Sequence, residues 1–193
     1  MSSNNIEIEI HVRIEKVSKL MEFLKKNGKF QSEKQQIDEY FTPAHRDFLS
    51  VRPITEWLRL RAAGSKYSIT YKNWKVDKDG KTYSCDEYET GLGDLEQLRK
   101  ILTALDFKSI VTVDKLRSTW IYQDYEVAID SVKNLGEYVE IEYIGKDEQA
   151  DPKSVTREMV GLLKKIGCGT ITRDYLGYPF ELLFPKEVTR EIQ

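Results

Sequence analysis

Five predicted strands of the sequence each carry two like charges separated by a single residue. The pairs are Glu7 and Glu9, Arg59 and Arg61, Glu87 and Glu89, Lys115 and Arg117, and Glu140 and Glu142. Residues two apart point to the same face of a β-strand, so each pair would present one sign of charge on one face. Clustered carboxylates repel one another unless a cation lies among them, and their hard oxygens suit Mg²⁺ or Mn²⁺.

The basic pairs predict a negatively charged ligand. Clustered arginines and lysines bind polyanions, because guanidinium groups match phosphate oxygens in a two-pronged geometry. A metal-bound triphosphate would satisfy both sets of charges at once, with the basic strands on the phosphates and the acidic strands on the metal.

Alternation of apolar and polar residues places these pairs on predicted strands. Isoleucine or valine occupies every second position from Ile6 to Ile14, and Leu58 and Leu60 back the two arginines of "WLRLR". In "YSITYK" the same parity puts Lys72 with Ser68 and Thr70 on the polar face. About eight such strands, mostly joined by hairpin-like connections, predict a largely antiparallel sheet of the α+β class.

Three amphipathic helices are predicted to cover the apolar face of this sheet. The first helix follows the first strand and ends at Gly28. The second begins at the N-cap Asp94, and the third begins at Asp151-Pro152 and runs to Gly167. With the apolar face covered, the charged face would line the inside of a rolled sheet. The alternative is an ordinary solvated face, although five like-charged pairs are hard to reconcile with one, because neighbouring like charges repel.

Bulk properties restrict the class of protein. The chain has 193 residues and a formal net charge of −2, which suits one domain over 1–193 with tails at 1–4 and 184–193, and gives no global basic field for extended nucleic acid. The two cysteines fit a reducing compartment. Neither a signal segment nor a membrane span is visible, so we expect a cytoplasmic protein without a membrane partner.

The ordered motifs resemble one known family. "EIEIHVR" is similar to the Glu-x-Glu-x-Lys opening of the CYTH superfamily, the triphosphate tunnel metalloenzymes, and "QIDEYF", "WLRLR", "TYK", "DKLR" and "LGEYVEIE" follow in the family's order over roughly residues 5–183. The family includes class IV adenylyl cyclases, thiamine triphosphatases and inorganic triphosphatases. The chain length and the "HRDFL…WLRLR" region are most similar to the class IV adenylyl cyclases.

The resemblance implies a fold and a set of site residues. The fold would be an eight-stranded antiparallel β-barrel that encloses a hydrophilic tunnel, with the helices packed outside. Ligands of Mg²⁺ or Mn²⁺ would be Glu7, Glu9, Glu87, Glu89, Asp130, Glu140 and Glu142. The triphosphate, which could be ATP, inorganic triphosphate or thiamine triphosphate, would bind Arg59, Arg61, Lys72, Lys115, Arg117 and Arg173. The catalytic residues would be His11 with Glu7 and Glu9, and the oligomeric state, a homodimer included, is left open.

His11 departs from the family motif, which has lysine at this position. A histidine is near neutral at pH 7 and can serve as a general base, so the chemistry could survive with a different pH profile. Three readings therefore stay open: a class IV cyclase that forms cyclic AMP and pyrophosphate, a triphosphatase, or a binder of nucleotide or polyphosphate without catalysis. His45 is expected to be an exposed loop residue, and Trp57, Trp74 and Trp120 are expected to pack in the core.

Overall fold

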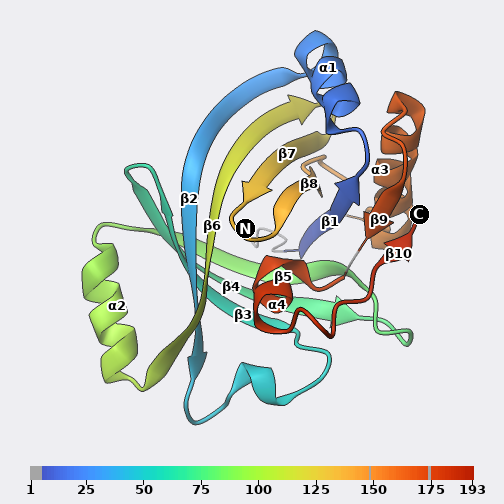
Figure 1. The fold of residues 1–193 in the computed structure, drawn as a ribbon. Helices are drawn as coiled ribbons and strands as arrows, with labels where there is room; N and C mark the ends of the chain where they lie inside the picture. The colour runs from blue at the N-terminus through green and yellow to red at the C-terminus, as the bar shows by residue number, and fades with distance from the viewer. Residues whose placement is uncertain (1–5, 148, 174) are drawn as a thin grey trace.

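The strands close into an antiparallel barrel, which confirms the expected α+β architecture (Figure 1). The computed structural model describes residues 6–147, 149–173 and 175–193. Around the barrel the strand order is β1-β5-β4-β3-β2-β6-β7-β8, and β8 pairs with β1 to complete the circle. The eight strands are β1 (Ile6–Ile14), β2 (Lys29–Pro43), β3 (Glu56–Ala63), β4 (Lys66–Val76), β5 (Thr82–Leu92), β6 (Phe107–Tyr122), β7 (Tyr125–Val132) and β8 (Gly136–Tyr143).

The first strand is the point of closure. Its beginning pairs with β5, the segment from Glu9 to Val12 pairs with β8, and its end pairs with β9 (Ile171–Arg173). Its apolar residues Ile8, Ile10 and Val12 are buried in the core outside the barrel wall. Because side chains alternate along a strand, the opposite parity turns the glutamates of β1 toward the lumen.

Three helices cover the outside of the barrel, as predicted (Figure 1). They are α1 (Val17–Asn27), α2 (Leu95–Ala104) and α3 (Pro152–Ile166). The described residues also form α4 (Gly177–Leu183) and the short 3₁₀ helix η1 (Phe48–Ser50). The caps are as expected, since Asp94 accepts a hydrogen bond from the Gln97 N–H at 3.0 Å and Asp151 accepts one from the Ser154 N–H at 2.8 Å.

Two apolar clusters show what the outer helices bury. Leu24 of α1 and Leu163 of α3 pack with Ile10 of β1, while Leu102 of α2 packs with Leu60 of β3. Burial of this face is strongly favourable, at about 1.5–3 kcal/mol for each large aliphatic side chain. The apolar side of the sheet is therefore occupied, and the charged side is left to face inward.

The C-terminal segment adds structure whose shape the sequence left uncertain. After β9 the chain forms α4 and then β10 (Glu191–Ile192), which pairs with β9, so part of the expected tail at 184–193 returns to the sheet. Tyr178 and Phe180 of α4 pack in a third apolar cluster with Tyr138 of β8. The other expected tail, residues 1–4, lies outside the described residues. No helix in the described part of the chain is long and apolar enough to span a bilayer.

Candidate functional site

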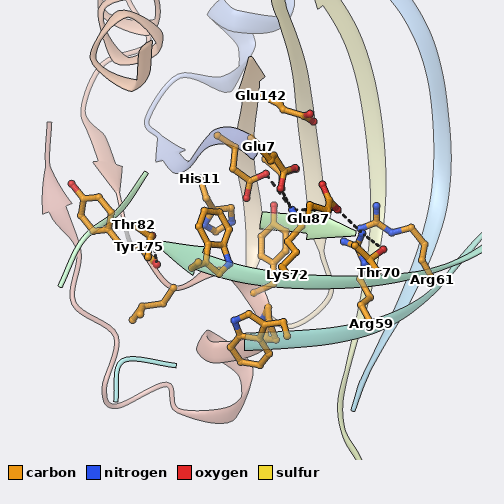
Figure 2. A pocket seen from close by; sticks show the side chains of 18 of the residues that line it. Glu7, His11, Arg59, Arg61, Thr70, Lys72, Thr82, Glu87, Glu142 and Tyr175 are labelled. Atoms are coloured by element: carbon orange, nitrogen blue, oxygen red, sulfur yellow. Dashed lines mark hydrogen bonds and ion pairs between the residues drawn. The ribbon is translucent and has the colours of Figure 1, made fainter. Parts of the chain in front are cut away.

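The barrel encloses a charged cavity of about 580 Å³, a volume typical of small-molecule sites (Figure 2). The structure brings nearly all of the predicted site residues to its wall. These residues are Glu7, Glu9, His11, Arg59, Arg61, Lys72, Glu87, Glu89, Lys115, Arg117, Glu140, Glu142 and Arg173. Asp130 is the exception, because it is fully buried and is not among the residues that line the cavity.

Glutamates of β1 and β8 form the acidic wall. Glu9 lies directly across from Glu142 in the antiparallel pairing, and His11 lies across from Glu140. Lys72, which enters from β4, donates to Glu7 Oε2 at 2.5 Å and lies 3.7 Å from Glu9 Oε2. Figure 2 shows the Lys72 side chain pointing toward Glu7 and Glu87.

The acidic wall carries more negative charge than its lysine can offset. Burial and the neighbouring Glu7 raise the pKa of Glu9 to about 8, against the opposing effect of Lys72. Burial and the charges of Glu7 and Glu9 raise the pKa of Glu142 to about 8. Burial would raise the pKa of Glu140 as well, but the charges of Arg117 and Lys115 outweigh it and hold that pKa well below its usual range.

The basic wall is built around a carboxylate that the sequence analysis did not assign. Asp38 of β2 accepts two hydrogen bonds from Arg61, at 2.6 and 2.7 Å, and it lies 4.0 Å from Arg59 and 3.9 Å from Lys115. Burial would raise the pKa of Asp38, but these three cations outweigh it and hold the pKa well below its usual range. Asp38 therefore stays charged and fixes the direction of Arg61.

Asp130 contacts the second basic pair, Lys115 and Arg117, much as Asp38 contacts Arg59 and Arg61. Arg117 donates to its two oxygens at 2.7 and 2.6 Å, Lys115 lies 3.3 Å away, and the Tyr178 hydroxyl donates to it at 2.7 Å. Burial and the charge of Arg117 lower the pKa of Lys115 to about 8, against the opposing effect of Asp130. The oxygens of Asp130 are engaged by these groups, which favours a role in positioning cations over the metal-ligand role first expected.

The β5 pair lies beside the arginines of β3. Glu89 accepts hydrogen bonds from Thr70 at 2.7 Å and from Arg59 at 3.4 Å, and Glu87 lies 4.0 Å from Arg59 and 3.8 Å from Lys72. Both glutamates thus face basic partners, so the β5 pair belongs to the junction between the acidic and basic walls.

His11 lies at the cavity wall among aromatic rings. Its imidazole stacks on Tyr138, with 4.7 Å between ring centroids, and it meets the edge of Tyr178 at 4.3 Å. These rings fix the plane of the imidazole. The side chain that replaces the motif lysine is therefore held within the site, as the strand parity predicted, whereas His45 is exposed as expected.

Two of the three tryptophans have a double role. Trp57, Trp74 and Trp120 all pack in apolar clusters, as expected, but Trp57 and Trp74 also line the cavity. Arg173 is buried, donates to the Thr82 carbonyl oxygen at 3.2 Å and lies 4.4 Å from the ring of Tyr175. It reaches the cavity from β9, which the sequence had left without a defined shape.

Comparison with known proteins decides the family. The CYTH domain model matches residues 5–174. The chain belongs to the CYTH family. It is 38% identical over 162 residues to a protein of Methanocaldococcus jannaschii named "Putative adenylate cyclase", an alignment that covers 83% of this chain and 89% of the relative.

Two solved structures share the fold. A Pyrococcus horikoshii protein superposes with a TM-score of 0.74 at 24% identity, covering 94% of this chain and 99% of the other. A Hippeastrum protein, described as a "Putative adenylyl cyclase" with a dominant triphosphatase activity, superposes with a TM-score of 0.60 at 21% identity, covering 89% of this chain and 91% of the other.

CYTH enzymes are typically metal-dependent, and the acidic wall fits a hard cation. Glu9 Oε2 is buried and has no hydrogen-bond partner among the described residues, and Glu9 and Glu142 oppose each other directly. In this conformation no three histidine, cysteine, aspartate or glutamate side chains of the described residues are already grouped as a metal site. Binding would therefore need rotation of the carboxylates toward the ion.

Sequence reasoning missed two acids on the inner side of this CYTH barrel, of which Glu126 lines the cavity and Asp38 is buried behind it. Asp38 stands two residues before Tyr40, and Tyr40 lines the cavity; Glu126 stands four residues before Asp130 on β7. Strand parity alone could have placed both inward. Neither belongs to the five like-charged pairs of predicted strands from which the site was predicted. Tyr178 had no such signal, since the sequence around it shows no periodicity.

Proposed function

We propose that this CYTH protein is a metal-dependent enzyme that converts ATP into cyclic AMP and pyrophosphate, as class IV adenylyl cyclases do. The observation that carries the proposal is that a basic wall and an acidic wall face each other within one closed barrel. Further support comes from the Methanocaldococcus jannaschii relative, whose name is that of an adenylate cyclase.

The residues of the cavity suit the charge movements of this reaction. The 3′-hydroxyl oxygen of ATP would attack the α-phosphorus, the bond from that phosphorus to the oxygen bridging to the β-phosphate would break, and pyrophosphate would leave. Arg59, Arg61 and Arg117 would bind the phosphate oxygens and offset the charge that shifts onto the leaving group. Their guanidinium groups are already oriented by Asp38 and Asp130, which reduces the reorganisation needed.

His11 is the candidate for moving the proton of the attacking hydroxyl. A neutral imidazole can accept that proton, and the stacked Tyr138 ring limits the directions in which it can do so. Carboxylates of β1 and β8 would hold Mg²⁺ or Mn²⁺, which when bound would bridge phosphate oxygens and offset their charge.

Hydrolysis of a triphosphate is the second candidate. The two walls bind phosphates without determining which phosphorus is attacked, and the Hippeastrum protein of the same fold is described as having a dominant triphosphatase activity. In that reaction water would attack the terminal phosphorus and inorganic phosphate would be released. The same side chains would bind the triphosphate, so only the position of the nucleophile differs.

Product analysis separates these functions. The protein would be incubated with ATP, inorganic triphosphate or thiamine triphosphate, each with Mg²⁺ or Mn²⁺, and Arg59→Ala would control for contaminating phosphatases. Equal amounts of cyclic AMP and pyrophosphate support the cyclase, whereas inorganic phosphate alone supports the hydrolase. Binding by calorimetry without turnover would identify a nucleotide or polyphosphate binder, and absence of both binding and turnover would overturn the proposal.

A further inference from the structure

The acids of the cavity fall into two groups according to their partners. Glu7 accepts hydrogen bonds from Lys72 and from the Cys85 thiol, at 2.5 and 3.1 Å, and Glu140 accepts one from Arg117 at 2.8 Å. These carboxylates are compensated by the protein itself. A second group is not compensated in this way, and it lies in one line across three neighbouring strands.

This line consists of Glu9, Glu142 and Glu126, which we call the acidic row. Glu9 of β1 is directly across from Glu142 of β8, and Glu142 is directly across from Glu126 of β7. All three side chains line the cavity. Within the described residues, neither Glu142 nor Glu126 has a basic side chain within 4.0 Å, and Glu9 has only Lys72, at 3.7 Å and without a hydrogen bond.

Such a row is costly without a counter-charge. Ionising all three carboxylates together is unfavourable, because like charges directly opposite each other on adjacent strands are destabilising and Glu9 is only 8% exposed. Glu9 Oε2 is buried, has no hydrogen-bond partner among the described residues, and belongs to a side chain that lines the cavity. Three carboxylates of this kind supply the hard oxygen donors that Mg²⁺ and Mn²⁺ prefer.

We propose that Glu126 of β7 is a further ligand of the divalent cation that Glu9 and Glu142 would hold. The proposal rests on the metal-dependent function proposed above, and it adds a ligand from β7 to the glutamates of β1 and β8. Glu126 and Glu142 are partly exposed, so their side chains can turn toward the ion. A cation there would allow the three carboxylates to be ionised together.

The test measures Mn²⁺ binding in the absence of any triphosphate. Wild type, Glu126→Gln and Glu142→Gln would be titrated with Mn²⁺ by calorimetry, and free Mn²⁺ would be followed by electron paramagnetic resonance. Glu137→Gln is the matched control, because Glu137 lies on β8 but is exposed. We expect Glu126→Gln to weaken Mn²⁺ binding at least about tenfold, since even indirect partners of a metal contribute on that scale, and the control to bind like wild type.

Thermal unfolding gives a second readout that a merely structural role would not produce. Mn²⁺ should raise the melting temperature of Glu126→Gln less than that of wild type, because the variant has lost one carboxylate ligand. Wild-type Mn²⁺ affinity in Glu126→Gln, alongside loss of binding in Glu142→Gln, would overturn the role of Glu126 and leave the proposed function intact. If wild type bound triphosphate but no Mn²⁺, the acidic row would fail as a cation site; if it bound neither, the proposed function would fail as well.

Discussion

Removal of the Asp38 carboxylate should destabilise the protein more than any exposed charge does. The Asp38 side chain is 1% exposed, and it neutralises Arg61 at 2.6 Å, Lys115 at 3.9 Å and Arg59 at 4.0 Å. Breaking one partner out of a buried ion pair typically costs 3–5 kcal/mol, because the remaining charge stays buried without compensation. We therefore expect Asp38→Ala to lower the free energy of unfolding by about 3–5 kcal/mol.

Urea denaturation followed by tryptophan fluorescence measures this loss. Glu22→Ala is a suitable control, since Glu22 forms an ion pair of similar length with Lys19, at 3.2 Å, but both side chains are exposed, at 68% and 54%. An exposed pair contributes at most about 1 kcal/mol. A double-mutant cycle of Asp38→Ala and Arg61→Ala should give a coupling energy of about 1.5–3 kcal/mol, the range for a charged hydrogen bond.

The pH dependence of the same variant tests the reasoning independently. The folded-state pKa of Asp38 lies below the unfolded value, so its contribution is fully present above the unfolded pKa and is lost as pH falls toward the folded one. The difference between wild type and Asp38→Ala should accordingly narrow in acid. A loss below about 1 kcal/mol at pH 7, no larger than in the control, would refute the view that Asp38 organises the basic wall.

Three further predictions concern ligands. Because burial and neighbouring carboxylates raise the pKa of Glu9 and Glu142 from 4.5 to about 8, the folded protein binds more protons than the unfolded chain between these values. The stability of the metal-free protein should therefore fall as pH rises across that interval. Mn²⁺ titrations in buffers of different ionisation enthalpy should show proton release. A stability that does not change with pH would contradict this prediction. Arg59→Ala should weaken triphosphate binding by about 1.5–3 kcal/mol in calorimetry, roughly ten- to a hundredfold, and unchanged affinity would count against the basic wall. His11→Ala should lower turnover at least about a hundredfold with little change in triphosphate affinity if the imidazole moves the proton, and His11→Lys should shift the pH profile; full activity in His11→Ala would remove His11 from the mechanism.

Strand parity made much of the site predictable. The charged pairs of β1, β3 and β8 have apolar residues at odd spacing, and Lys72 was placed by the same rule; the cavity includes all of these charged residues. The helix caps at Asp94 and Asp151 depend on residues close together in the sequence, and they too were predicted. What these features share is that a few adjacent residues determine them.

Pairing between distant strands could not be derived from local pattern. Asp130 was expected to bind metal, but its partner on β6 is Arg117. In this register Arg117 donates hydrogen bonds to both oxygens of Asp130. The alignment of Glu126 with Glu142 and Glu9 likewise depends on the order β7-β8-β1. Only the resemblance to CYTH proteins, which implied a closed barrel, indicated that the first strand would meet the eighth.

The internal ion pairs also indicate how the two ligands would affect each other. Without ligands, Lys72 neutralises Glu7 and Arg117 neutralises Glu140, so acidic and basic side chains on strands two apart in the barrel satisfy part of each other's charge. A triphosphate that drew Lys72 and Arg117 onto its oxygens would leave these two carboxylates uncompensated and more attractive to a cation. Coupling between ligands is reciprocal, so a cation on the acidic wall would release the same two basic side chains for phosphate. The charge pairs inside the barrel therefore favour joint binding of cation and triphosphate over binding of either one alone.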